Sequence, residues 1–142
     1  MKDSKEVLAG IVQTVQRGQL YIECALNVPI SKTLHAALQL QLQEFNHIEA
    51  EARSIAYSRG WGLDELQLGL MAVRKIWTKL QYTFGNADYK AVSITITHNT
   101  KGMIQNLHNL RQFNLSDQRI SALSQKLLDF ENSNIRQMQG FL

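Results

Sequence analysis

The scarcity of helix-breaking residues constrains this chain more than any other feature. Its 142 residues include one proline, Pro29, and eight glycines. Proline is excluded from helix interiors because it lacks a backbone N–H and its ring collides with the preceding turn, and glycine weakens helices. A chain poor in both favours long helices over a loop-rich β fold. At this length we expect one domain, residues 1–142, that is large enough to bury a core.

Two long segments carry apolar residues at the three- and four-residue spacing of one helix face. The first covers residues 4–27 and ends ahead of Pro29, because the residue before a proline disfavours the helical conformation. The second begins with Ser31 as N-cap and continues to residue 59, where Gly60 supplies the left-handed C′ position. The short link between them predicts an antiparallel hairpin.

Two further helices are predicted beyond Gly60. The shorter covers residues 64–84, and the longer covers residues 89–113. Within the longer one, the β-branched run 92–98 alternates as a strand would, but a lone strand has no partner in this chain. A helical stripe extends through the whole segment, so a helix is predicted there. Its inward stripe is Val92, Ile96, Met103, Leu107 and Leu110.

The last helix is predicted from a cap at Asn114, Ser116 or Asp117 to about residue 140. With the segment before it, this helix forms a second antiparallel hairpin. Two hairpins joined by a long connection are typical of the ferritin-like bundle. The predicted fold class is therefore all-α: a four-helix bundle of ferritin-like topology with a helical crossover around residues 64–84.

The composition excludes several classes of protein. The net charge is +3 and the basic residues are scattered, whereas nucleic-acid binders gather them on one face. No apolar run is long enough to span a membrane, and the N-terminus lacks a signal peptide, so we expect a cytoplasmic protein. The single cysteine, Cys24, excludes an intrachain disulfide. No nucleophile, phosphate-loop or dinucleotide motif occurs, so no catalytic residue is predicted.

Polar residues interrupt the inward faces of the long helices near mid-height. A helix turns about 100° per residue, so each polar side chain has a fixed angle from the apolar stripe of its helix. The antiparallel hairpins bring these positions to one level. The predicted polar core layer consists of Gln19, Glu23, Gln41, Glu44, Asn99, Glu131 and Asn134. The four histidines are expected at the surface rather than in a cluster.

Three members of this layer, Glu23, Glu44 and Glu131, are candidate ligands of a divalent metal. Ferritin-like di-metal proteins carry two Glu-x-x-His motifs. Here Glu44-x-x-His47 is one such motif, with its histidine turned outward, and Asn134 stands where the second histidine would be. Carboxylate and amide oxygens suit a hard ion such as Mg²⁺ or Mn²⁺. The alternatives are a hydrogen-bonded network that only fixes helix register, and a site for a small ligand or partner; no other cofactor is expected.

The crossover helix predicts self-association. Met71, Trp77 and Tyr82 surround a basic strip in this segment. Because a crossover lies outside a bundle that is already closed, we expect these three side chains to be partly exposed and to form a dimer contact. The alternative is that Trp77 packs onto the bundle, as large aromatic side chains often do.

Residues 18–21, 44–48, 59–61, 99–103 and 135–140 give the chain a likeness to known proteins. Over nearly its whole length it resembles a family of small uncharacterised bacterial proteins of ferritin-like architecture. The resemblance implies a four-helix bundle with a long crossover and no particular activity. The predicted function is that of a non-catalytic helical bundle that acts through self-association or protein partners. The alternative is a metal-binding ferritin-like protein with a degenerate mid-bundle carboxylate site.

Overall fold

A computed structural model of the protein describes residues 3–63, 75, 86–112 and 117–142. These residues form the helices α1 (Ser4–Leu26), α2 (Lys32–Ser58), α4 (Ala87–Gln112) and α5 (Gln118–Gln139), and the described part of the chain contains no strand. The predicted all-α bundle is confirmed. Apart from Lys75, the helix predicted over residues 64–84 lies outside the described residues, and so do Met71, Trp77 and Tyr82.

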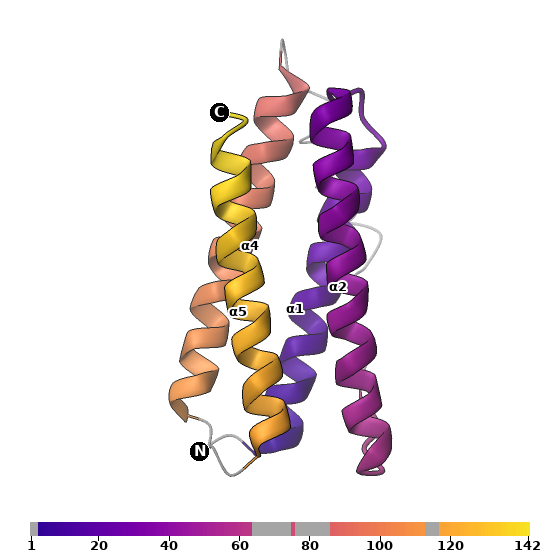
Figure 1. Ribbon diagram of the computed structural model, residues 1–142, viewed down its shortest axis with the longest axis vertical. Coiled ribbons are helices and arrows are strands. Elements are labelled where there is room, and N and C mark those ends of the chain that lie inside the picture. Colours follow the sequence, from indigo (N-terminus) through magenta and orange to yellow (C-terminus); the bar gives the residue numbers. More distant parts are fainter. Residues whose placement is uncertain (1–2, 64–74, 76–85, 113–116) are drawn as a thin grey trace.

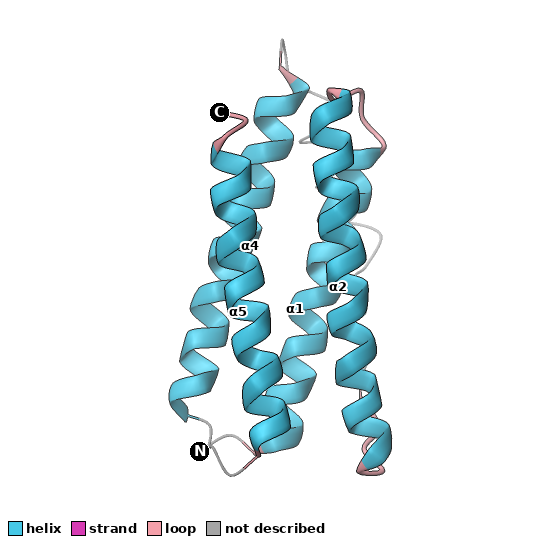
Figure 2. Ribbon diagram, in the orientation of Figure 1, coloured by secondary structure: helices cyan, strands magenta, loops and turns pink. Residues whose placement is uncertain are grey.

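The four helices lie side by side along one axis, as Figure 1 shows. α1 packs along α2 and α4 along α5, and α1 also contacts α4 while α2 contacts α5. α1 and α5 run in one direction and α2 and α4 in the other, so these four pairs are antiparallel, while α1 and α5, which also contact each other, are parallel (Figure 1). The loops that the structure describes lie at the two ends of the bundle (Figure 2).

Side-chain caps fix where the helices begin. The Ser31 hydroxyl accepts a hydrogen bond from the backbone N–H of Leu34 at 3.2 Å, and the Asp117 carboxylate accepts one from Ile120 at 3.3 Å. These side chains satisfy N–H groups that have no partner within the first helical turn. After α2, Gly60 has a φ of 68°, which only glycine adopts without strain. The predicted caps Ser31 and Asp117 and the stop at Gly60 are confirmed.

The buried face of α4 differs from the predicted one. Of the predicted stripe, Val92 is buried, while Leu107 is 41% exposed. The helix is rotated by roughly a quarter of a turn, on the rule of about 100° per residue, which brings small and amide side chains inward. α5 offers these side chains hydrogen-bond partners, so the rotation leaves few of them unsatisfied. The buried residues of α4 are Ala91, Val92, Thr95, His98, Asn99, Gly102, Asn106 and Asn109.

None of the described helices combines the length and the hydropathy that a membrane span requires.

Candidate functional site

The predicted polar layer divides into an exposed and a buried part. Glu23 is exposed, and Gln19 and Glu44 are half-buried. The Gln19 amide donates to the Asn46 and Glu49 side chains of α2, at 2.9 and 3.5 Å, so it belongs to the rim of the α1–α2 interface. Gln19, which its helical angle predicts near the centre of the inward face, is only half-buried, and Glu23 is exposed, so neither reaches the centre of the bundle.

The structure does not bring the three candidate metal ligands together. Glu131 is buried, Glu23 is exposed, and Glu44 lies 3.7 Å from His47, whose side chain is 74% exposed. Among the described residues, no three His, Cys, Asp or Glu side chains gather as they would around an ion. Position 23 lies at the outer edge of α1, and position 44 is turned toward the surface of α2. The predicted set of Glu23, Glu44 and Glu131 is therefore not assembled.

Amides of the predicted polar layer form two separate contacts between helices. Asn134 Nδ2 of α5 donates to Asn99 Oδ1 of α4 at 3.4 Å, and Asn99 Nδ2 donates to the Thr95 carbonyl at 2.9 Å. On the other side, Gln41 Nε2 donates to Gln137 Oε1 at 3.0 Å. These bonds satisfy most of the amide groups and link particular helices, which is the role of a register-fixing network.

Glu131 is a polar residue buried in the core of the bundle. It is fully buried, and neither carboxylate oxygen has a hydrogen-bond partner in the described part of the protein. A Cβ atom at Gly102 would collide with this carboxylate, so the glycine makes the room that it occupies. Burial raises the pKa of Glu131 from 4.5 to about 8 because the charged form is poorly solvated there. At neutral pH the side chain is mostly a protonated, uncharged acid.

His98 is buried, which contradicts the expectation that the histidines lie at the surface. It is 8% exposed, and its Nε2 has no hydrogen-bond partner among the described residues. Its ring centroid lies 5.0 Å from that of Tyr21 and 6.4 Å from that of Phe45. The pKa of His98 is lowered from 6.5 to about 4, mainly by burial and in addition by the charges of Arg17 and Lys101. The imidazole is therefore neutral at physiological pH.

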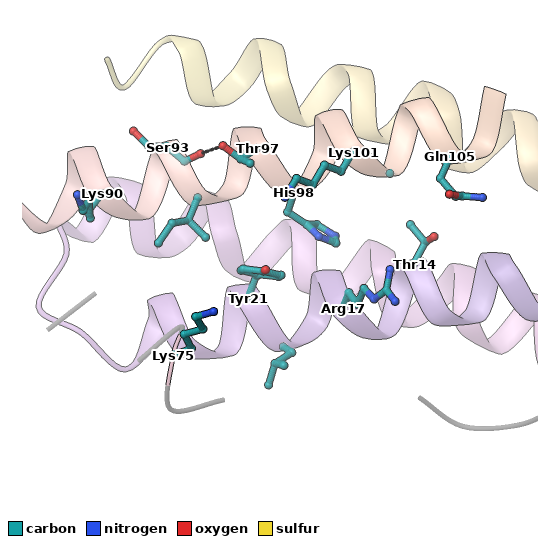
Figure 3. Close-up of a pocket in the computed structure, with 13 residues that line it drawn as sticks. Thr14, Arg17, Tyr21, Lys75, Lys90, Ser93, Thr97, His98, Lys101 and Gln105 are labelled. Carbon is teal, nitrogen blue, oxygen red and sulfur yellow. Dashed lines mark hydrogen bonds between the residues drawn. The ribbon is translucent and has the colours of Figure 1, made fainter. Parts of the chain in front are cut away.

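A groove beside His98 runs between α1 and α4, and we call it the α1/α4 groove. Its volume is about 730 Å³, within the range of small-molecule sites. Figure 3 shows the His98 ring reaching from α4 toward Tyr21 and Arg17 on α1. Gly102 also lines the groove, and it is the residue that separates the groove from the buried carboxyl of Glu131.

The lining of the α1/α4 groove is strongly cationic. Four basic side chains face it, and the lining contains no carboxylate among the residues that the structure describes. None of the four forms an ion pair with a described residue. Like charges gathered in one concave site repel each other and attract an anion. These side chains are Arg17, Lys75, Lys90 and Lys101.

The groove is not predicted from the sequence, although the spacing of two of its lysines is visible there. Lys90 and Lys101 are eleven residues apart, about three helical turns, and therefore share one face of α4. Arg17 lies on a different helix, and only the packing of α1 against α4 brings it to the same site. Its position in the sequence, distant from both lysines, gives no indication of that contact.

Comparison with protein-family models, curated proteins and solved structures finds no match to this chain. The likeness to a ferritin-like family therefore stays a prediction. The described lining of the groove is neutral at His98 and cationic at Arg17, Lys90 and Lys101.

Proposed function

We propose that this chain is a non-catalytic binding protein that holds a small anionic molecule in the α1/α4 groove. The observation that carries the proposal is the set of four cationic side chains around one groove of about 730 Å³, with no carboxylate among its described lining residues. On a protein surface that binds no ligand, acidic and basic side chains are usually mixed. An anion placed beside His98 would relieve the repulsion between Arg17 and Lys101, whose charges both act on that ring.

The uncharged polar groups of the groove suit the same ligand. Tyr21, Ser93 and Thr97 offer hydroxyl groups, and the Thr97 hydroxyl already donates to the Ser93 carbonyl at 2.8 Å. His98 also lines the groove, and its neutral imidazole has one N–H group. Hydrogen bonds from charged and neutral donors together would hold a phosphate or carboxylate group.

We also propose ferritin-like topology for the bundle. Its support is the direction of the helices: α1 and α5 run one way, α2 and α4 the other, and α2 ends at the opposite end of the bundle from the start of α4 (Figure 1). A connection that returns along the length of the bundle is what distinguishes this topology from one with short loops throughout.

Self-association stays a second prediction. The predicted dimer contact of Met71, Trp77 and Tyr82 falls on residues that the structure does not describe. Light scattering tests it, and a strict monomer at tens of micromolar would contradict it. The metal-binding alternative stays a prediction, and it draws no support from the described residues, among which Glu23, Glu44 and Glu131 do not gather.

Calorimetric titration with phenyl phosphate at low salt tests the proposed binding. Arg17→Gln and Lys101→Gln should each weaken binding about tenfold, the usual loss for one charge-assisted hydrogen bond. Lys5→Gln is the matched control, because Lys5 is an exposed cation in the first turn of α1 and does not line the groove. An equal loss in the control, or no binding to the unmodified protein, would contradict the proposal.

A further inference from the structure

His98 is a titratable ring in the wall of the α1/α4 groove. It reaches from α4 toward Tyr21 and Arg17 of α1, as Figure 3 shows. The ring centroid of Tyr21 lies 5.0 Å away, and that of Phe45 on α2 lies 6.4 Å away. Because the ring is 8% exposed, nearby charges act on it with less screening than they would in bulk water.

Among the described residues, the charges that act on His98 are positive. Arg17 on α1 and Lys101 on α4 both lower its pKa, in addition to the larger effect of burial. The α2 residue that contacts the ring is the uncharged Phe45, and Glu131 of α5 is a neutral acid well below its pKa of about 8. The described lining of the groove contains no carboxylate that would offset the cations. His98 is therefore a neutral base in a positive field.

A bound anion would reverse the effect of this field on His98. Lying between Arg17 and Lys101, it would offset their charges, and its own negative charge would favour the protonated imidazole. Lys75 and Lys90 are the other cations of the described lining. A nearby opposite charge typically shifts a pKa by about 1–3, so an anion in the groove should raise the proton affinity of His98 at least about tenfold.

From this arrangement we infer that the α1/α4 groove takes up its anion together with a proton, and that His98 is the residue that receives the proton. The inference rests on the proposed function, that the groove binds an anion. The proton comes from the solvent and adds to the lone pair of an imidazole nitrogen. Because coupling between two binding events is reciprocal, protonation of His98 should strengthen anion binding by the same factor. An anion of constant charge should therefore bind more tightly as the pH falls from 6.5 toward 4.

A different reading is that His98 stays neutral when the anion binds, because its ring is too deeply buried to carry a charge. The Nε2 atom has no hydrogen-bond partner among the described residues, and a proton there would be poorly stabilised. The two readings differ in the pH at which His98 titrates when the groove is occupied.

Nuclear magnetic resonance of the histidine ring nitrogens distinguishes the two readings. The signals of His98 are followed as the pH falls from 7, with and without saturating phenyl phosphate, which keeps one negative charge below its second pKa of about 6. Phenyl phosphate should move the titration of His98 to higher pH, with a gain in proton affinity of about tenfold. His108 is the internal control, because it is exposed on the same helix and does not line the groove. Its titration should not change.

Calorimetry in two buffers with different heats of ionisation measures the coupling as protons taken up per bound ion. At a pH of about 5, a tenfold gain in proton affinity corresponds to about 0.4 proton per ion. His98→Phe keeps a ring against Tyr21 and Phe45 but cannot receive a proton, so this variant should lose the uptake. His108→Phe is the matched control and should retain it.

The outcomes separate the coupling from the proposed function. An unchanged titration of His98 in protein that binds phenyl phosphate, an equal change at His108, or undiminished proton uptake by a folded His98→Phe protein would overturn the coupling and leave the proposed function intact. The resonance measurement needs only the unmodified protein, so it decides the question even if His98→Phe does not fold. Failure of phenyl phosphate to bind at all would contradict the proposed function itself.

Discussion

The two hairpins of this bundle bury very different surfaces. α1 and α2 bury mostly aliphatic and aromatic side chains, among them Leu8, Leu38 and Phe45, which are fully buried. α4 buries mainly hydroxyl, imidazole and amide groups, and α5 adds Ser124, Glu131 and Asn134 to its apolar residues. The two hairpins are therefore held in place by different interactions, apolar burial in α1 and α2 and polar contacts in α4 and α5.

This difference indicates a division of roles. Apolar burial is non-directional and supplies most of the stability of a bundle, whereas buried polar groups stabilise only the arrangement in which their partners are present. The first hairpin therefore serves as a stable scaffold. The second hairpin carries specific contacts, and the α1/α4 groove lies along the boundary where the two hairpins meet.

The largest expected effect comes from the apolar hairpin. Leu38 is fully buried, so Leu38→Ala removes buried surface and leaves a cavity, and should lower the free energy of unfolding by about 2–5 kcal/mol. Leu40→Ala on the same helix is the matched control, because Leu40 is 63% exposed and should change stability by no more than about 0.5 kcal/mol. Urea unfolding followed by circular dichroism measures both. Similar losses would show that α2 does not bury the face described here.

Glu131 and His98, in the hairpin of α4 and α5, should make the free energy of unfolding depend on pH. The pKa of Glu131 is raised from 4.5 to about 8, so its contribution to folding stability is fully present below pH 4.5 and is lost as the pH rises to about 8. The pKa of His98 is lowered from 6.5 to about 4, so its contribution is present above pH 6.5 and is lost as the pH falls to about 4. Between pH 4.5 and 6.5 the two groups change the free energy of unfolding in opposite directions. Above pH 6.5 only Glu131 changes it.

We therefore expect the free energy of unfolding to fall between pH 6.5 and 8. One proton changes it by about 1.4 kcal/mol per pH unit, so the total fall should be about 2 kcal/mol over this window. Glu131→Gln keeps the size of the side chain and removes its titration, and this variant should show almost no fall. Urea unfolding at several pH values measures the difference, and equal slopes for both proteins would show that Glu131 is already ionised when folded.

An effect of similar size is expected at Gly102, where α4 meets the Glu131 carboxyl. Gly102→Ala should lower the free energy of unfolding by about 1–3 kcal/mol, because the added Cβ collides with that group. Gly10→Ala is the matched control in α1: its Cβ would lie 3.3 Å from the Asn109 amide, and the better helix propensity of alanine offsets the crowding. Combining Gly102→Ala with Glu131→Ala should recover part of the loss. A Gly102→Ala protein as stable as the unmodified one would contradict the close approach.

The sequence predicts the helices well and the site only in part. Helix ends depend on local chemistry, and Ser31, Gly60 and Asp117 act where their residue types indicate. The burial of Asn99, Glu131 and Asn134 follows from helical angles alone. Angles are least informative near the edge of a face, and Glu23 lies there.

The face of α4 is hard to predict for a different reason. The apolar residues Ile104 and Leu107 are exposed, while amides occupy the interior because Ser124 and Asn134 on α5 offer them hydrogen-bond partners. That preference depends on a partner helix and is absent from the periodicity of α4 itself. The cationic groove has the same origin, since Arg17 joins Lys90 and Lys101 only when α1 packs against α4.

The most direct test of the central claim is to locate a bound anion by nuclear magnetic resonance. Titrating phenyl phosphate into ¹⁵N-labelled protein should shift the backbone amide signals of Arg17, Tyr21, Thr97 and Lys101, and the ring nitrogen signals of His98, because these residues line the α1/α4 groove. Signals from the outer faces of α2 and α5 should remain in place. Shifts spread over basic residues of the whole surface, or centred on Arg59 and Arg119 at the far end of the bundle, would contradict a specific anion site between α1 and α4.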